Sequence, residues 1–346
     1  MRSLLFVFAF ALQAPAQTPA AVEKDFVVRD FKFQSGATLP EVRVHYRTIG
    51  NPGNPAVLLL HGSSGDATQL MAASFSGALF GPGQPLDATK HFLILPDLLG
   101  NGKSTRPSDG LHAKFPKYGY GDMVELEHRL VTEGLGIQHL RLVMGVSMGG
   151  MHTWMWGVRY PGMMDGLVPV AAQPVPVEGR NLLWRRILSS AIRNDPEWKG
   201  GDYTQQPRGF LSIMPMFDML IQSPLRLGES LTGIEKADAY LQQFNEKTRT
   251  SDDANNILYR FEASWDYNPT PNLEAIQAPL LAIVFDDDEL NPAETGVMER
   301  LMPRVRNGRL ALIPAGNGSQ GHRTQVQAGV WRDKLVEFLG SLPGRQ

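Results

Sequence analysis

A serine between two glycines is the feature of this sequence best suited to do chemistry. Residues 145–149 read Gly-Val-Ser-Met-Gly, directly after an apolar run and directly before a helical segment. A strand that turns this sharply into a helix leaves little room beside the serine, so glycines flank it and the Ser147 hydroxyl stands exposed. An N-capping serine in a glycine-rich turn is the alternative. The order of strand, turn and helix predicts that Ser147 is a nucleophile.

A serine hydroxyl needs a base to take its proton, and histidine is the usual one. Only His152 and His322 follow Ser147 in the chain. His152 lies five residues further along the same helical segment, so we expect it to point away from the hydroxyl and to be a core histidine. His322 lies in a glycine-rich loop after the strand-like run 310–313, where loops carry catalytic groups. His322 is therefore the predicted base.

An acid that orients the base is expected between the serine and the histidine. Asp286, Asp287 and Asp288 follow the apolar run 280–285. Adjacent carboxylates repel one another, so a solvated acidic loop is the alternative for two of them. We assign the acid to Asp288 because the following loop leaves it at the turn after the strand. Its expected role is to hold His322 and to stabilise the imidazolium.

Acyl transfer also needs hydrogen-bond donors for the developing oxyanion. The Met148 backbone N–H is one candidate, since it lies at the positive end of the helix that Ser147 opens. The second donor is expected from the turn at residues 61–65, His-Gly-Ser-Ser-Gly, with the Ser63 backbone N–H as the candidate. His61 is expected to shape this turn rather than to act as a base or ligand.

The apolar pattern indicates the elements that position these residues. Alternating residues at 26–33 and 42–49 are typical of half-buried antiparallel strands. Near-continuous apolar runs, typical of parallel strands buried on both faces, occupy residues 56–60, 92–95, 140–144 and 280–285. Helical segments are predicted at residues 124–135, 148–160 and 326–339. This alternation predicts an α/β fold with a doubly wound, mostly parallel sheet.

One long segment interrupts the alternation. Residues 173–271 show helical periodicity, as at 182–193 and 234–247, but no strong strand. We predict a helical lid at 173–271, inserted between a first core part at 22–172 and a second at 272–346. Candidate lid residues lining the pocket are Trp184, Met214, Met216, Phe217 and Met219, with packing inside the lid as the alternative for most. A homodimer, if one forms, is expected to associate through this lid.

Composition and the first residues bear on location and partners. The chain has 346 residues, a formal charge of -2 and no cysteine, which excludes disulfides and gives no electrostatic reason to expect a nucleic-acid partner. Arg2, the apolar run 4–12 and the Ala-Pro-Ala sequence at 14–16 predict a signal peptide at residues 1–16, with a frayed helix as the alternative. The mature protein is therefore expected in the periplasm or outside the cell. No later segment is long and apolar enough to span a membrane.

The sequence resembles the α/β-hydrolase superfamily, and more narrowly the homoserine O-acetyltransferase family. The Ser-Met-Gly-Gly-Met motif at 147–151, Asp288 and the Gly-His pair ending at His322 carry the resemblance to the catalytic region. More specific matches are Phe-Gly-Pro-Gly at 80–83, Ala-Ile-Arg-Asn-Asp-Pro at 191–196, Gly-Gly-Asp-Tyr at 200–203 and Asp-Tyr-Asn-Pro at 266–269. The resemblance implies an α/β-hydrolase fold with a lid, and it independently favours Asp288 as the acid.

The departures from that family concern the groups that hold its amino-acid acceptor. Arg323 follows the histidine, where the resemblance implies an Asp for the substrate amino group. Met214 stands in place of an Arg for the substrate carboxylate, and Ile221 in place of a Tyr. Such a pocket would be more apolar, would lack an anchor for an ammonium group, and would attract a carboxylate or oxygen-rich group through Arg323. Homoserine acetylation is therefore not expected.

The leading hypothesis is an exported serine hydrolase that cleaves a small or medium acyl ester without cofactor or metal. The first alternative is an O-acyltransferase with an acceptor other than homoserine, because an alcohol can capture the same acyl-enzyme. The second is a non-catalytic binding protein on the same fold, which the presence of Ser147, Asp288 and His322 in order disfavours.

Overall fold

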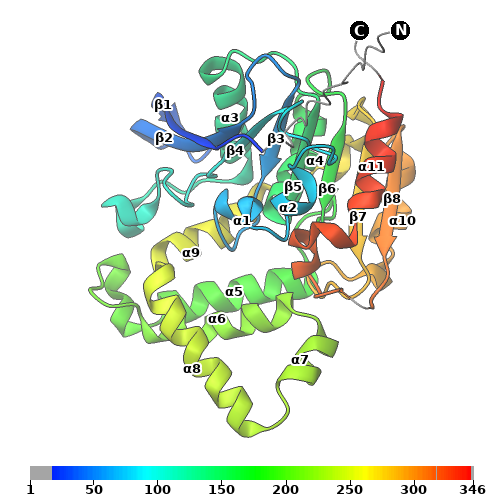
Figure 1. The fold of residues 1–346 in the computed structure, drawn as a ribbon. Coiled ribbons are helices and arrows are strands. Elements are labelled where there is room, and N and C mark those ends of the chain that lie inside the picture. The colour runs from blue at the N-terminus through cyan, green and yellow to red at the C-terminus, as the bar shows by residue number, and fades with distance from the viewer. Residues whose placement is uncertain (1–17, 317, 344–346) are drawn as a thin grey trace, which may run out of the picture.

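The computed structural model describes residues 18–316 and 318–343 (Figure 1). Within these residues, one sheet has the strand order β1-β2-β4-β3-β5-β6-β7-β8. The strands are β1 (Val22–Lys32), β2 (Thr38–Ile49), β3 (Ala56–Leu60), β4 (Phe92–Pro96), β5 (Leu142–Val146), β6 (Leu167–Val170), β7 (Leu280–Phe285) and β8 (Gly308–Ile313). The pairs β1–β2 and β2–β4 are antiparallel, and the remaining pairs are parallel. The predicted α/β fold with a mostly parallel sheet is confirmed.

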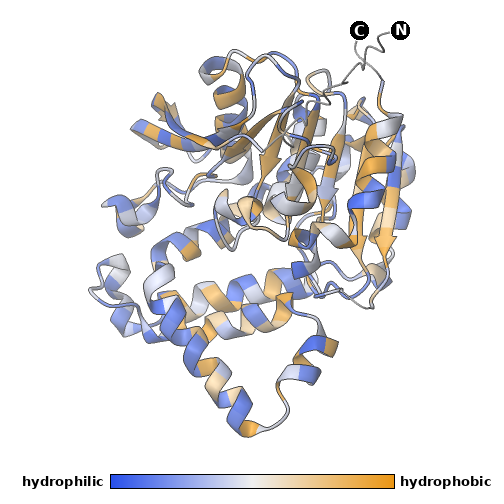
Figure 2. Ribbon diagram, viewed as in Figure 1, coloured by the Kyte–Doolittle hydropathy of each residue, from blue (hydrophilic) through white to orange (hydrophobic). Residues whose placement is uncertain are grey.

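Helices cover both faces of this sheet, which is why its central strands are apolar throughout. On β3, Leu58 and Leu60 pack into the core on one face, while Val57 and Leu59 pack into the core on the other. Figure 2 shows these central strands as hydrophobic along their length. The first face is covered by α3 (Tyr120–Arg129), α4 (Met148–Arg159) and α10 (Val297–Leu301). The second face is covered by α1 (Thr68–Met71), α2 (Ser76–Leu79) and α11 (Arg332–Ser341).

The chain between β6 and β7 contains helices and no strand in the described structure. They are α5 (Gly179–Arg193), α6 (Arg208–Ile221), α7 (Pro224–Ser230), α8 (Ile234–Ser251) and α9 (Ala254–Glu262). In Figure 1, α5, α6 and α8 lie below the sheet, and α9 runs back toward the core. Their apolar side chains form a separate cluster that includes Trp184, Phe210 and Phe261. We call this helical segment the lid.

Strands β1, β2 and β5 differ from the predicted runs only in their ends, and three other elements differ more. Strand β6 was not predicted, because it has four residues and contains Pro169, which cannot donate to a sheet. The predicted helix at 326–339 begins only at Arg332, since short 3-10 turns occupy residues 323–326 and 328–330. The helix predicted at 124–135 starts earlier, at Tyr120, and its α-helical part ends at Arg129, where a π-helical turn follows.

The predicted signal peptide at residues 1–16 lies outside the described residues. Among the helices of residues 18–316 and 318–343, none combines the length and the hydropathy needed to cross a membrane.

Candidate active site

Ser147 occupies the sharp turn between β5 and α4. Its backbone has a φ of 52° and a ψ of -114°, a conformation that residues with a side chain rarely adopt. The turn is possible because its neighbours lack side chains. A Cβ on Gly145 would lie 2.1 Å from the Gly149 carbonyl oxygen, and a Cβ on Gly149 would lie 2.2 Å from that of Leu60. The two glycines thus allow the backbone to place the Ser147 hydroxyl beyond the carboxyl end of β5.

His322 lies between Ser147 and Asp288. Its Nε2 is 2.8 Å from Ser147 Oγ, and its Nδ1 is 2.7 Å from Asp288 Oδ2. Because a carboxylate only accepts hydrogen bonds, Nδ1 donates to Asp288, which leaves Nε2 to accept from the serine hydroxyl. The structure thus brings together the three residues that the sequence singled out, in an arrangement suited to proton abstraction from Ser147.

The Asp288 carboxyl is buried but well supplied with donors. In addition to His322, it accepts from Asn291 Nδ2 at 3.0 Å and from the backbone N–H groups of Leu290 at 2.9 Å and Asn291 at 3.2 Å. Burial raises the pKa of this carboxyl, but the charge of His322 and these hydrogen bonds outweigh burial and lower the pKa below its ordinary value. An ionised Asp288 can therefore stabilise a protonated His322.

The two carboxylates before Asp288 have different surroundings. Asp286 is exposed, as a solvated loop residue would be. Asp287 is not: its Oδ2 accepts the Gly321 backbone N–H at 3.0 Å, and its Oδ1 is buried without a partner among the described residues. The alternative of a solvated acidic loop therefore describes Asp286, whereas Asp287 contacts the residue directly before His322.

The predicted oxyanion donors are the backbone N–H groups of Ser63 and Met148. Met148 follows Ser147 in the chain, and Ser63 lies near Ser147 in space. Neither N–H group donates to a protein acceptor within the described residues. The next amide of α4, that of Gly149, donates to the His61 carbonyl at 3.1 Å and so joins the start of the helix to the Ser63 loop. A Cβ on Gly62 would lie 3.4 Å from Ser147 Cβ, which shows how closely the loop approaches the serine. This placement is compatible with donation to an oxyanion at Ser147.

His61 fixes the direction of the Ser63 amide. The Leu98 N–H donates to His61 Nε2 at 3.0 Å, so the ring proton is on Nδ1, which donates to the Gly62 carbonyl at 2.7 Å. The Gly62 carbonyl and the Ser63 N–H belong to one planar trans peptide and point in opposite directions. Holding the carbonyl therefore orients the N–H, which is the turn-shaping role expected for His61.

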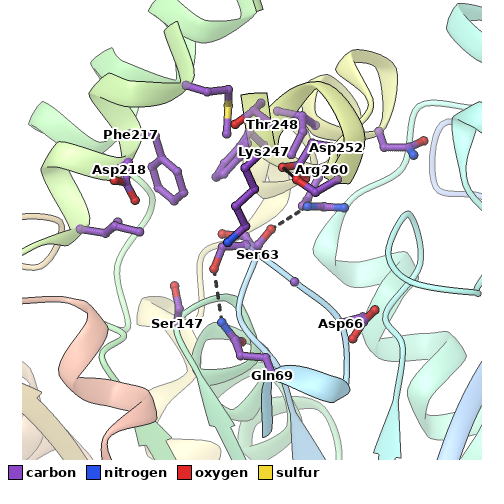
Figure 3. A pocket seen from close by; sticks show the side chains of 18 of the residues that line it. Ser63, Asp66, Gln69, Ser147, Phe217, Asp218, Lys247, Thr248, Asp252 and Arg260 are labelled. Atoms are coloured by element: carbon purple, nitrogen blue, oxygen red, sulfur yellow. Dashed lines mark hydrogen bonds between the residues drawn. The ribbon is translucent and has the colours of Figure 1, made fainter. Parts of the chain in front are cut away.

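A cavity of about 650 Å³ lies between Ser147 and the lid (Figure 3). Phe217 and Phe261 are among its apolar lining residues. Its charged lining residues include the cations Arg106, Lys247, Arg260 and Arg323, and the anions Asp66, Asp218, Asp252 and Asp253. The cavity wall therefore combines apolar and charged side chains. No group of three or more His, Asp or Glu side chains suited to a metal ion occurs within the described ranges.

The helical period of α6 decides which of its side chains reach the cavity. Met214 lies one turn before Phe217 and Ile221 one turn after it, and all three line the cavity. Met216 and Met219 are on the other side of the helix, 45% and 52% exposed, so their predicted place in the pocket lining is wrong. Trp184, on α5, packs inside the lid and stacks on Phe217 at 4.6 Å between ring centres.

Comparison with known proteins agrees with this geometry. The family model for the alpha/beta hydrolase fold matches residues 55–306. A homoserine O-acetyltransferase from Trichormus variabilis is 31% identical over 298 residues, which cover 76% of this chain and 79% of that protein. The chain belongs to the alpha/beta hydrolase fold family, in its homoserine O-acetyltransferase-like branch.

Solved structures of a transferase and of a hydrolase share this fold. A homoserine O-acetyltransferase from Bacillus anthracis superimposes with a TM-score of 0.81 at 22% identity, covering 94% of this chain and 99% of that chain. An acetylester hydrolase from Corynebacterium glutamicum gives 0.80 at 20% identity, with coverages of 92% and 96%. At this level of identity the superpositions show the alpha/beta hydrolase fold alone.

Arg323, a departure from the homoserine O-acetyltransferase pattern, is not a free cation. Its Nη2 donates to Asp218, a buried carboxylate on α6 that also accepts from Tyr240 on α8. Arg323 thus has a carboxylate partner within the protein, which the sequence did not indicate. Asp218 could not have been found from the family motifs, because it lies one helical turn beyond Met214 and reaches the site only through the packing of the lid.

Proposed function

We propose that this protein is a serine esterase that hydrolyses small acyl esters. The observation that carries the proposal is the continuous hydrogen-bond path from Ser147 through His322 to Asp288 at the floor of the cavity. Ser147 Oγ attacks the ester carbonyl while His322 takes its proton, and the Ser63 and Met148 N–H groups bind the oxyanion. His322 then gives the proton to the leaving alcohol, and water releases the acyl group by the same steps in reverse order.

The composition of the cavity wall supports hydrolysis. Arg323 is held by Asp218, and Met214 and Ile221 offer no hydrogen-bond donor of the kind that fixes an amino-acid carboxylate. An acyl-enzyme in such a site has water as its available acceptor. The acetylester hydrolase with the same fold provides a precedent for this chemistry in this architecture.

Acyl transfer is the second candidate, and Asp218 is the observation that favours it. This carboxylate lines the cavity and would suit an acceptor with an ammonium group if Arg323 moved away. The 31% identity to a homoserine O-acetyltransferase points the same way. A non-catalytic binding protein is disfavoured, since binding alone does not require the hydroxyl of Ser147 to be bonded to a histidine.

The test compares the two acceptors directly. Purified protein is incubated with p-nitrophenyl acetate, and separately with acetyl-CoA and homoserine, and the products are followed by mass spectrometry. We expect acetate from the first mixture and no O-acetylhomoserine from the second. Efficient formation of O-acetylhomoserine without ester turnover would overturn the esterase proposal. The Ser147→Ala variant serves as the control for non-enzymatic hydrolysis in both mixtures.

Export is part of the proposal and rests on residues 1–16 alone. N-terminal sequencing of the protein recovered from the periplasm or the medium of an expressing bacterium tests it. A mature chain that begins at Gln17 is the expected result, and an uncleaved chain confined to the cytoplasm would contradict it.

A further inference from the structure

An arginine of the lid holds the loop that carries the candidate oxyanion donor. Arg260 lies on α9, 7% exposed, and its guanidinium lines the cavity (Figure 3). Nη1 donates to the Ser63 carbonyl at 2.9 Å, and Nη2 donates to the Gly100 carbonyl at 3.2 Å. One side chain of the lid therefore joins two core loops, the one after β3 and the one after β4.

Ser63 is thereby held on both sides. His61 fixes the peptide that precedes Ser63, through the Gly62 carbonyl, and Arg260 fixes the peptide that follows, through the Ser63 carbonyl. Two adjacent peptide planes determine the backbone conformation of the residue between them. The Ser63 N–H belongs to the first plane, so the bond from Arg260 acts on it through the position of Ser63: without this bond the loop could shift and take the N–H away from the oxyanion.

In the described structure, the guanidinium of Arg260 is bonded to main-chain carbonyls alone. It makes no ion pair within the described residues, because both of its bonds go to main-chain carbonyls, and its buried Nε has no partner there. An arginine stays protonated, and the charges of Asp252 and Asp66 act on this one although neither carboxylate pairs with it directly. The positive charge lies beside Ser63, where an oxyanion would develop negative charge.

We propose that Arg260 is a positioning residue that couples the lid to the oxyanion hole of the esterase reaction. The inference rests on the proposed function, since it takes the Ser63 N–H to be an oxyanion donor. The lid then has a role beyond enclosing the substrate: the hole reaches its working geometry only when α9 is docked on the core.

The chain offers a matched control in Arg185 on α5. Arg185 is also 7% exposed, and its Nη1 donates to the Phe261 carbonyl at 3.1 Å and to Ser264 Oγ at 3.3 Å. Its Nε donates to Asn181 Oδ1 at 2.9 Å, and none of these three acceptors belongs to the candidate catalytic machinery. Arg185→Met therefore measures the effect of losing a buried lid arginine. Arg260→Met has this effect too, and in addition it removes the hydrogen bond to the Ser63 carbonyl.

The experiment compares the parent, Arg260→Met, Arg260→Lys and Arg185→Met, each at a folded fraction established by near-UV circular dichroism. The readouts are kcat and KM for p-nitrophenyl acetate and the rate of phosphonylation by a fluorophosphonate. We expect Arg260→Met to lower kcat and the phosphonylation rate about 10- to 100-fold at nearly constant KM, because a misplaced oxyanion donor weakens transition-state rather than ground-state binding. Arg185→Met should leave both rates within about threefold of the parent.

Equal losses in Arg260→Met and Arg185→Met, or a change in KM alone, would overturn the proposal. If Arg260→Met does not fold, Arg260→Lys decides. Lysine keeps the positive charge but cannot replace the guanidinium that bonds to both the Ser63 and the Gly100 carbonyl. A kcat in Arg260→Lys below that of the parent by about tenfold supports the proposal, and a parent-like kcat overturns it. If the parent itself neither turns over esters nor reacts with the fluorophosphonate, the proposed function has failed, which is a distinct outcome.

Discussion

At the scale of single residues, three adjacent carboxylates have three different surroundings. Asp288 is buried against His322, Asp287 holds the Gly321 N–H, and Asp286 faces solvent. The surroundings differ because successive side chains at the end of a strand point in different directions.

Substituting each of these carboxylates by its amide should give graded losses of turnover. Asp288→Asn is expected to lower kcat by about 10⁴, because an amide favours the wrong tautomer of His322. Asp287→Asn should cost about tenfold or less, since it weakens only the support of the loop before the base. Asp286→Asn is the control and should match the parent. Steady-state kcat on p-nitrophenyl acetate measures all three, and a collapse in Asp286→Asn with an active Asp288→Asn would move the acid role to Asp286.

Chain order and local context were enough to predict which residues meet at Ser147. Asp218 and Arg260 were not predictable in this way. Both belong to the lid, and nothing in their local sequence indicates the cavity, because only the packing of α6 and α9 against the core brings them there.

At the scale of elements, the loop before His322 is fitted against the end of the lid helix α6. Gly321 has a φ of +64°, and a Cβ there would lie 2.7 Å from the Gln222 carbonyl carbon and 2.8 Å from the Ser223 backbone nitrogen. Gly318, in the same loop, has a φ of +98° but would meet only Val330, at 3.6 Å. Substituting either glycine by a residue with a side chain would strain the backbone, but only a side chain at Gly321 would also collide with the lid.

Gly321→Ala should reduce kcat far more than Gly318→Ala. Both variants are expected to lose about 1–2 kcal/mol of stability from the left-handed backbone conformation. Only Gly321→Ala should also displace His322, and a shift of this kind costs on the order of 10² in rate. Thermal unfolding and kcat, measured on both variants, separate the two effects. Equal kcat values would show that the contact with Gln222 and Ser223 does not position the base.

Strands β3, β4, β5 and β7 were predictable because each is buried along its whole length, and the burial of β3 in two cores explains why both of its faces are apolar. The ends of helices and strands were less predictable from the sequence. The start of α11 follows from tertiary contacts: the 3-10 turns before it place Ala328 and Trp331 in the core against α2 and Phe75, which a helical period at 326–339 does not reveal.

At the scale of the whole molecule, charged groups attach the edge hairpin to the rest of the core. Glu23 on β1 accepts from Lys103 Nζ at 2.5 Å and from Arg47 Nε at 3.0 Å, and Arg47 in turn binds Asp97 at 2.9 Å. The hydrogen bond from Lys103 is the largest cause that lowers the pKa of Glu23, from its ordinary 4.5 to about 2.

Glu23→Gln should lower the melting temperature in a pH-dependent way. A carboxyl with a lowered pKa in the folded state stabilises the fold above its unfolded-state pKa, and this stabilisation is lost as the pH falls toward the folded-state pKa. The difference in Tm between parent and variant should thus be constant above pH 4.5 and shrink as the pH falls toward about 2. Calorimetric melts across this range test it, and a difference that grows in acid would contradict the assignment.

The outer side of the lid bears on the predicted homodimer. Leu183 and Ile187 on α5, and Met216 and Met219 on α6, are exposed apolar side chains at helical spacing. We expect two copies to associate through these helices, and light scattering coupled to size exclusion should report twice the chain mass of 38.2 kDa. Leu183→Glu combined with Met219→Glu should give the monomer. A parent that is monomeric at micromolar concentration would contradict this prediction.

The most direct test of the account is to find which side chain becomes covalently modified when the protein meets a fluorophosphonate. The reagent phosphonylates only a serine activated by a base, so peptide mapping by mass spectrometry locates the nucleophile. The account predicts one adduct, on Ser147, formed in proportion to the loss of esterase activity, with no adduct and a kcat lower by about 10⁶ in Ser147→Ala. An adduct on another residue, or turnover in Ser147→Ala within about tenfold of the parent, would contradict it.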